Sequence, residues 1–278
     1  MTAADPDPAM PPPVHLLHLT DLHLPPPGET VHGADTASRL DAVLDDILAR
    51  HGPGGEMPRP EFAVVTGDLT RDGEPAAYRR LRAALARLPC PAHLLMGNHD
   101  KRAAFRATFP EARMDADGFV QQAVHAAAGL CLMLDTLEEG RPEGRLCARR
   151  LAWLAARLAE SGGAPVLLFM HHPPMPVGMA AMDQAGLMDA AALWAVLAPH
   201  RGRIRHLFHG HLHRPIAGAW HGIPVFSLRG SAFDVALDLA PPPRQVSVEA
   251  SKTPCYAVIR VTEDSIVAHT RALLPTPC

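Results

Sequence analysis

Short apolar runs that end at a polar turn recur along the whole chain. Runs of this length between turn signals are typical of buried strands. They predict strands over Val14–Thr20, Phe62–Thr66, Ala92–Met96, Phe119–His125, Leu130–Leu134, Val166–Met170, Ile204–Phe208, Ile223–Leu228, Gln245–Val248, Tyr256–Val261 and Ile266–Arg271.

Longer segments place apolar residues three or four positions apart, which predicts helices with one buried face. In the first of them, Leu40, Val43 and Leu44 share a face, and the Gly-Pro-Gly-Gly run that follows His51 ends the helix. The predicted helices cover Asp35–Arg50, Pro75–Leu88, Leu146–Glu160 and Leu187–Leu197.

The order of these elements indicates an α/β fold. Strands and helices alternate up to His213, and only strands are predicted after it. This order favours two packed sheets with helices on the outside. We expect one domain over residues 14–272, β-rich from about residue 222, with a disordered Pro-rich tail at 1–13 and a short tail at 273–278.

Composition excludes several classes of protein. The net charge is −3 and no long basic run occurs, so a nucleic-acid partner is not expected. No apolar run is long enough to span a membrane, and the N-terminus does not read as a signal peptide. The five cysteines form no CxxC pair, which favours thiols in a reducing compartment. We therefore expect a cytoplasmic protein.

Metal-ligand residue types follow the apolar runs at five separate places. Because strand ends meet at one rim of a sheet, residues far apart in the chain can converge there. One Asp-x-His triplet or one Gly-Asp turn is a weak signal, whereas all five segments together are specific. Carboxylate, amide oxygen and imidazole suit transition metals better than calcium or magnesium. The segments are HLTDLH with Asp21 and His23, VVTGDLT with Asp68, LLMGNHD with Asn98 and His99, LLFMHHPP with His171 and His172, and LFHGHLH with His211 and His213.

With these five segments the chain resembles the calcineurin-like metallophosphoesterases, whose pattern is DxH, GDxx, GNHD, a histidine segment and GHxH. The resemblance runs from Val14 to Arg271. The strings HHPPMPVGMAAMDQAGLMD and GIPVFSLRGSAF are similar to the bacterial branch that contains class III cyclic-nucleotide phosphodiesterases and glycerophosphodiesterases. The resemblance implies a four-layer α/β/β/α sandwich with a binuclear metal centre at the strand ends.

The resemblance also implies a role for each motif residue. Asp68 would bridge the two metals, and His99 would face the substrate phosphate without binding metal. His171 would be the ligand of its pair, with His172 beside it. The ligands implied for one metal are Asp21, His23 and His213, and those for the other are Asn98, His171 and His211.

Such a centre suits phosphodiester hydrolysis. Two carboxylates contribute a charge of −2 and two divalent ions contribute about +4. The net positive charge attracts an anionic ester. The metals would activate a water to hydroxide for in-line attack, and His99 would donate a proton or stabilise the phosphoryl oxygens. The donor set permits Mn, Fe, Zn or Co.

Several assignments stay open at this stage. Cationic side chains near the motif turns either contact substrate or are solvated surface charge; they are Arg71, Lys101, Arg102, Arg214 and Arg229. Arg102, Arg214 and His172 are the candidates for contacting the metal ligands or the substrate. The Met-rich loop Pro173–Met188 is a wall of the substrate pocket, an interface or a packed loop.

The sequence thus predicts a metal-dependent hydrolase of small phosphodiesters, with a 3′,5′-cyclic nucleotide as the favoured substrate. Glycerophosphodiesters, or a broad specificity that includes monoesters, are the alternatives within the same chemistry. A metal-binding module without catalysis is the alternative from another class. A homodimer through the C-terminal β region is also considered.

Overall fold

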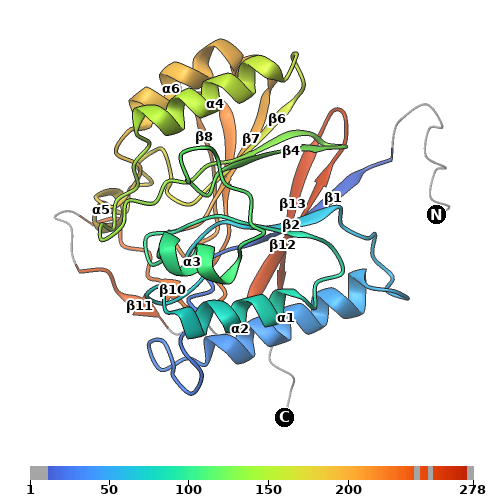
Figure 1. Ribbon diagram of the computed structural model, residues 1–278, viewed down its shortest axis with the longest axis vertical. Coiled ribbons are helices and arrows are strands. Elements are labelled where there is room, and N and C mark those ends of the chain that lie inside the picture. The colour runs from blue at the N-terminus through green and yellow to red at the C-terminus, as the bar shows by residue number, and fades with distance from the viewer. Residues whose placement is uncertain (1–11, 241–244, 250–252, 274–278) are drawn as a thin grey trace.

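The computed structural model describes residues 12–240, 245–249 and 253–273 (Figure 1). Most of the tails expected at 1–13 and 273–278 therefore lies outside the described residues. Two mixed sheets face each other, with α4 and α6 over one sheet and α1 and α2 over the other (Figure 1). The helices are α1 (Thr36–His51), α2 (Pro75–Leu85), α3 (Arg102–Thr108), α4 (Ala148–Glu160), α5 (Ala180–Asp183) and α6 (Ala190–Leu197), followed by the 3₁₀ helix η1 (Ala198–Arg203).

The first sheet has the strand order β13-β12-β1-β2-β3. Strands β1, β2 and β3 are parallel. In the C-terminal hairpin, β12 pairs antiparallel with β1, and β13 pairs antiparallel with β12. The buried run FAVV of β2 is typical of a strand covered on both faces. The bounds are β1 (Val14–Leu19), β2 (Phe62–Val65), β3 (Ala92–Leu94), β12 (Cys255–Val261) and β13 (Ile266–Ala272).

The second sheet has the order β4-β5-β6-β7-β9-β8, with β5, β6, β7 and β9 parallel and the two edge strands antiparallel. A small separate ladder pairs β10 with β11. The bounds are β4 (Gln122–Ala126), β5 (Gly129–Met133), β6 (Val166–Met170), β7 (Ile204–His209), β8 (Ile216–Trp220), β9 (Ile223–Ser227), β10 (Asp234–Val235) and β11 (Val248–Glu249).

Three apolar clusters fill the spaces between the layers. Leu16 and Val64 of the first sheet pack with Phe169 and Phe208 of the second. A second cluster joins the first sheet to α1 and α2, and a third joins the other sheet to α4 and α6. Two sheets flanked by helices are thus the predicted α/β/β/α arrangement.

Capping and periodicity explain the helix α1. The Asp35 side chain accepts a hydrogen bond from the Ser38 amide at 3.0 Å, which satisfies a free N–H at the helix start. The apolar stripe Leu40, Val43, Leu44 and Ile47 is buried against the first sheet.

The structure corrects several predicted elements. The strand expected over Gln245–Val248 is only the two-residue β11, and the helix expected from Leu187 begins at Ala190. The short elements α3, α5 and β8 were not predicted. They are short or rich in Ala and Gly, so their apolar residues show no clear helical or strand periodicity.

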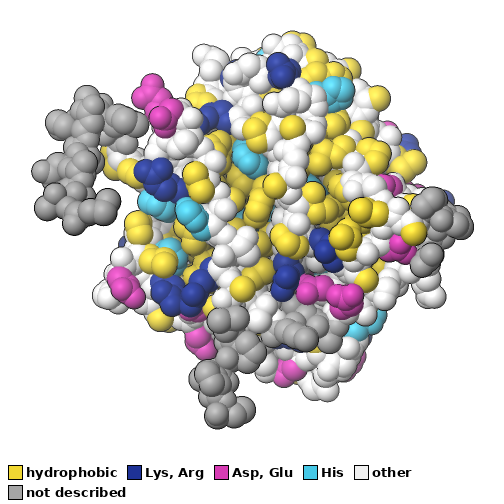
Figure 2. Space-filling view, turned by 180° about the vertical axis from the view of Figure 1, so that it is seen from behind, with side chains coloured by type: hydrophobic (Ala, Val, Ile, Leu, Met, Phe, Trp, Pro, Cys, Tyr) yellow, Lys and Arg dark blue, Asp and Glu magenta, His cyan; other side chains and the backbone are white. Residues whose placement is uncertain are grey.

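The described residues show no helix long and apolar enough to cross a membrane. In the view of Figure 2, basic side chains are scattered among apolar and uncharged ones and form no continuous patch.

Candidate metal centre

The loops after β1, β2, β3, β6 and β7 bring the predicted ligands together between the two sheets. Asp21, His23, Asp68 and His213 form one buried group whose ligand atoms lie within 4.8 Å of one another. The Nε2 atoms of His23 and His213 are 3.1 Å apart, and Nε2 of His213 is 3.3 Å from Asp21 Oδ1. This group contains the three ligands predicted for one metal.

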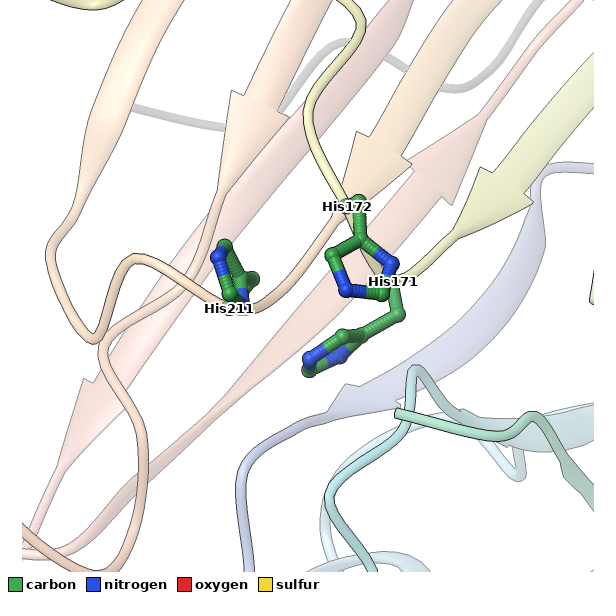
Figure 3. Close-up of side chains that lie close together, drawn as sticks. All are labelled: His171, His172 and His211. Atoms are coloured by element: carbon green, nitrogen blue, oxygen red, sulfur yellow. The ribbon is translucent and has the colours of Figure 1, made fainter. Parts of the chain in front are cut away.

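Asn98 contacts both of the other residues in the second group of predicted ligands. Its Oδ1 atom lies 3.1 Å from His171 Nε2 and 3.1 Å from His211 Nδ1. Figure 3 shows the rings of His171, His172 and His211 lying together beside the strand ends. The three ligands predicted for the other metal therefore also meet.

Asp68 lies between the two groups. Its Oδ2 atom is 3.3 Å from His23 Nε2, and its Oδ1 atom is 3.4 Å from His171 Nε2. Each carboxylate oxygen thus faces a different group, which is the geometry that a bridging ligand requires.

His172 lies close to both histidines of the second group: one ring nitrogen from each of His171, His172 and His211 lies within 4.8 Å of the others. Both of its ring nitrogens already have partners. Nδ1 lies 2.8 Å from Thr136 Oγ1, and Nε2 lies 3.2 Å from the Pro142 carbonyl oxygen, which can only accept. A metal would have to displace these hydrogen bonds, whereas Asn98 Oδ1 already faces the other two histidines.

Burial and the central carboxylate set the protonation of the site. Burial lowers the pKa of His23 to about 4 and holds the pKa of His211 well below its ordinary value. Burial also opposes protonation of His171, but Asp68 outweighs it and raises the pKa of His171 to about 9. His171 would therefore release a proton when it binds a metal.

The backbone at the site is strained. In the described part of the chain, seven residues other than glycine have a positive φ, a conformation that costs about 1–3 kcal/mol. Five of the seven are the predicted ligands Asp21, His23, Asp68, His211 and His213. Such strain clusters at functional sites because the surrounding packing must hold it.

Close backbone approach is a second local requirement. A Cβ atom on Gly97 would lie 2.1 Å from Asp68 Oδ1, and one on Gly210 would lie 2.0 Å from Thr20 Oγ1. Thr20 Oγ1 in turn donates to Asp21 Oδ2 at 2.7 Å. The glycines of GNHD and GHLH thus let the carboxylates approach the neighbouring loops.

His99 lies beside the cluster without joining either group. Its Nδ1 atom donates to the Arg71 carbonyl at 2.7 Å, which leaves Nε2 available. Burial lowers the pKa of His99, but Asp68 and the Arg71 carbonyl outweigh this effect and raise it.

Asp100 has a structural role that sequence reasoning did not assign. This buried carboxylate accepts hydrogen bonds from the amides of Leu69, Thr70 and Gly97 and from the Tyr78 hydroxyl. These hydrogen bonds connect the GDLT loop to the GNHD loop. Asp100 is the last residue of the GNHD motif, and this position in the motif could have indicated its role. Burial, followed by the charge of Asp68, raises the pKa of Asp100 to about 6.

Most of the arginines near the motif turns have other partners. Arg71 pairs with three carboxylates, and Arg102 forms two hydrogen bonds with Asp135. Arg214 donates to the Val235 carbonyl, and Arg229 pairs with Asp234. No arginine or lysine, Lys101 included, is among the described residues that line the pocket above the cluster.

That pocket has a volume of about 510 Å³. Five of the seven predicted ligands and His99 form its floor, and part of the Met-rich loop forms a wall. The lining comprises His23, His32, Asp68, Asn98, His99, Pro142, Ala181, Met182, Gln184, Ala185, His211, His213, Phe233, Val235, Val246 and Val248.

Two relatives share most of their length with this chain. A probable cyclic nucleotide phosphodiesterase of Rhodopseudomonas palustris is 44% identical over 255 residues, which cover 90% of this chain and 89% of the relative. A cAMP/cGMP dual specificity phosphodiesterase of Mycobacterium tuberculosis is 36% identical over 232 residues, which cover 81% of this chain and 70% of the relative.

The fold is similar to that of a dimetal phosphatase from Danio rerio, with a TM-score of 0.67 at 17% identity. The likeness covers 93% of this chain and 96% of that structure. The family model of the calcineurin-like phosphoesterases matches residues 14–215. With a match over most of the chain, two mixed sheets and a buried His/Asp cluster at their strand ends, this chain belongs to the calcineurin-like phosphoesterase family.

Proposed function

We propose that this protein hydrolyses small phosphodiesters at a two-metal centre, with a 3′,5′-cyclic nucleotide as its favoured substrate. The observation that carries the proposal is the position of Asp68, whose two carboxylate oxygens face two separate groups of buried ligand atoms. One carboxylate shared by two donor groups suits a pair of cations better than a single cation.

The donor set fits transition-metal ions. Asp21, His23 and His213 would hold one ion, Asn98, His171 and His211 the other, and Asp68 both. Bound divalent ions would supply Lewis acidity, lowering the pKa of a water and offsetting charge on the phosphoryl oxygens. Imidazole, amide and carboxylate donors are compatible with Mn, Fe, Zn or Co.

The residues around the donor set orient it. The Thr66 carbonyl accepts from His171 Nδ1 at 2.7 Å, so Nε2 is the nitrogen that faces Asn98 and Asp68. The Phe233 carbonyl does the same for Nδ1 of His213 at 3.0 Å. These backbone partners hold a proton on Nδ1 of each ring and leave Nε2 as the nitrogen that would bind a metal.

His99 would deliver the proton that the departing alkoxide needs. The Arg71 carbonyl holds one proton on Nδ1, so Nε2 is the nitrogen that would carry the transferred proton. His99 lines the pocket floor, where a substrate phosphate would lie. A positioned general acid accelerates such a step by about 10²–10⁴-fold.

The pocket favours a diester over a monoester. A monoester carries a second negative charge at neutral pH, and no lysine or arginine is among the described lining residues that could offset it. The two relatives named for cyclic nucleotides direct the substrate proposal to that class of diester.

A substrate panel tests this function. Metal-stripped protein restored with Mn²⁺ would be assayed on cyclic AMP, glycerophosphoethanolamine, bis-p-nitrophenyl phosphate and p-nitrophenyl phosphate. We expect metal-dependent turnover of the diesters, fastest for cyclic AMP, and a weak rate on the monoester. A faster monoester rate would assign the protein to the phosphatases, and no turnover on all four despite bound metal would favour a non-catalytic module.

A His99→Ala variant tests the proton donor. We expect turnover of cyclic AMP to fall by about 10²–10⁴-fold while bound metal is unchanged. His125→Ala, on the exposed side of β4, is the matched control and should keep the parent rate. Equal rates for the two variants would remove His99 from the mechanism.

We also propose that two copies pair through the C-terminal β region, where β13 is the outer strand of its sheet. Light scattering on the purified protein would show a dimer if this is right and a monomer if it is wrong.

A further inference from the structure

His99 is held by a backbone atom of the loop that follows the GDLT motif. Its Nδ1 atom donates a hydrogen bond to the Arg71 carbonyl oxygen at 2.7 Å. A hydrogen bond to one nitrogen of an imidazole ring fixes the direction in which the other nitrogen points. The direction of His99 Nε2 therefore depends on what holds the backbone at Arg71.

The chain on the N-terminal side of Arg71 is fixed by backbone hydrogen bonds. The Arg71 amide donates to the Leu24 carbonyl at 2.9 Å, and Thr70 forms a parallel bridge with Leu24. The amides of Leu69 and Thr70 donate to the buried Asp100 carboxylate. These bonds hold the loop up to the Arg71 nitrogen, whereas the carbonyl that contacts His99 lies on the other side of the residue.

The Arg71 side chain holds that other side. Its guanidinium nitrogens lie 2.6 Å from a Glu29 carboxylate oxygen, 2.8 Å from one of Glu74 and 3.0 Å from one of Asp72. Glu74, the residue before helix α2, also accepts from the Asp72 amide at 3.0 Å. The guanidinium thus connects the residue that follows the carbonyl to the start of α2 and to the loop before α1.

This arrangement can hold a backbone in place, which a single surface ion pair rarely does. The side chains of Arg71 and Glu74 are only 29% and 22% exposed. Exposed pairs contribute little, but one planar guanidinium that binds several carboxylates fixes their relative positions. Without the guanidinium, three negative charges that meet around it would repel one another. The loop that carries the Arg71 carbonyl would then shift.

We propose that Arg71 is a positioning residue for His99: its guanidinium holds the loop so that its own carbonyl orients the imidazole ring. This inference rests on the proposed function, in which His99 is the proton donor. Arg71 is not among the described residues that line the pocket, so it would act without touching the substrate.

The nature of the leaving group separates this role from a general structural one. The alkoxide that leaves cyclic AMP is a strong base and needs a proton, whereas p-nitrophenolate is a weak base and needs little help. For Arg71→Ala on Mn²⁺-loaded protein, we expect kcat for cyclic AMP to fall by about 10- to 100-fold, since a shift of about 1 Å costs about 100-fold. The loss on bis-p-nitrophenyl phosphate should be much smaller. The KM for cyclic AMP and the metal content should stay at the parent values.

A double variant shows whether Arg71 acts through His99. If it does, Arg71→Ala should cost nothing further on cyclic AMP once His99→Ala is present, because residues that act as a unit have non-additive effects. Arg71→Lys keeps the charge but not the planar fork, and should recover part of the lost rate. Arg87→Ala is the matched control, because Arg87 has a similar exposure and pairs with Asp41 and Asp45 away from the pocket. It should keep the parent rate on both diesters.

Three results would overturn the positioning role while parent turnover leaves the proposed function standing. They are equal losses on the two diesters, additive losses in the double variant, and a loss of bound metal in Arg71→Ala. If circular dichroism shows that Arg71→Ala does not fold, Glu29→Gln removes one charge of the network instead. It should give a smaller loss with the same dependence on the leaving group, and equal rates on both diesters would overturn the role. If the parent itself hydrolyses no diester, the proposed function fails and the positioning role fails with it.

Discussion

Gly97→Ala should disable the metal centre although Gly97 contributes no ligand atom. The Cβ atom of an alanine would lie 2.1 Å from Asp68 Oδ1 and 2.3 Å from the Asp68 backbone nitrogen. The backbone atom cannot rotate away, so one of the two loops must shift. Since φ of Gly97 is not in the left-handed region, the effect is one of space alone.

The size of the effect follows from these distances. A separation of 2.3 Å is about 1 Å short of the 3.4 Å at which ordinary contact begins. A misplacement of about 1 Å at a catalytic group typically costs about 100-fold in rate. We therefore expect kcat/KM for cyclic AMP to fall by about 100-fold, or about 2.7 kcal/mol of transition-state stabilisation, with weaker metal binding.

Steady-state kinetics and metal content by mass spectrometry would measure both effects. Gly202→Ala is the matched control, because a Cβ atom there meets nothing within 4 Å and its φ is ordinary. Circular dichroism would show that both variants fold. A folded Gly97→Ala protein with parent activity and metal content would refute the inference that close packing of this loop holds Asp68 in place.

Three further predictions concern stability. Asp135→Ala should destabilise the fold by about 3–5 kcal/mol in urea titrations, because it leaves Arg150, only 3% exposed, and Arg102 without their buried carboxylate; a loss below 1 kcal/mol would contradict this. Burial opposes ionisation of Asp46, but hydrogen bonds from Arg271, a second arginine and a tyrosine outweigh it and lower its pKa from 3.8 to about 2. Its contribution is therefore present above about pH 4 and lost as the pH falls toward 2, and Asp46→Asn should remove about 1–2 kcal/mol of this pH-dependent stability, whereas parallel pH profiles for parent and variant would speak against it. Chelation of the metals should lower Tm by about 9 °C relative to protein at 100 times Kd of added Mn²⁺, since that excess stabilises by about 2.7 kcal/mol at each of the two sites; an unchanged Tm would show that the folded chain binds no metal.

Much of the fold could be predicted because its strands are buried on both faces. The run Val166–Met170 is apolar throughout, and its predicted bounds are those of β6. The edge strand Ile216–Trp220 has the sequence IAGAW and is mostly exposed, so no apolar run marks it. The short ladder of β10 and β11 depends on tertiary contacts that no local pattern encodes.

The candidate site, like the fold, could be predicted from the sequence only in part. The residue types after each strand were enough to predict which side chains meet, because strand ends converge at one rim. The positive φ of five of the predicted ligands could not be foreseen from the sequence, since the surrounding packing imposes it. Nor could the role of Phe233, which lies outside every motif and whose ring stacks on His213 at 4.2 Å between centroids.

The central claim is that Asp68 joins two metal sites. Metal content of Mn²⁺-reconstituted protein, measured by mass spectrometry for the parent and for Asp68→Ala together with diester turnover, tests it most directly. We predict two ions per parent chain, and at most one ion and no measurable turnover for the variant. Two bound ions and parent turnover in Asp68→Ala would contradict the claim.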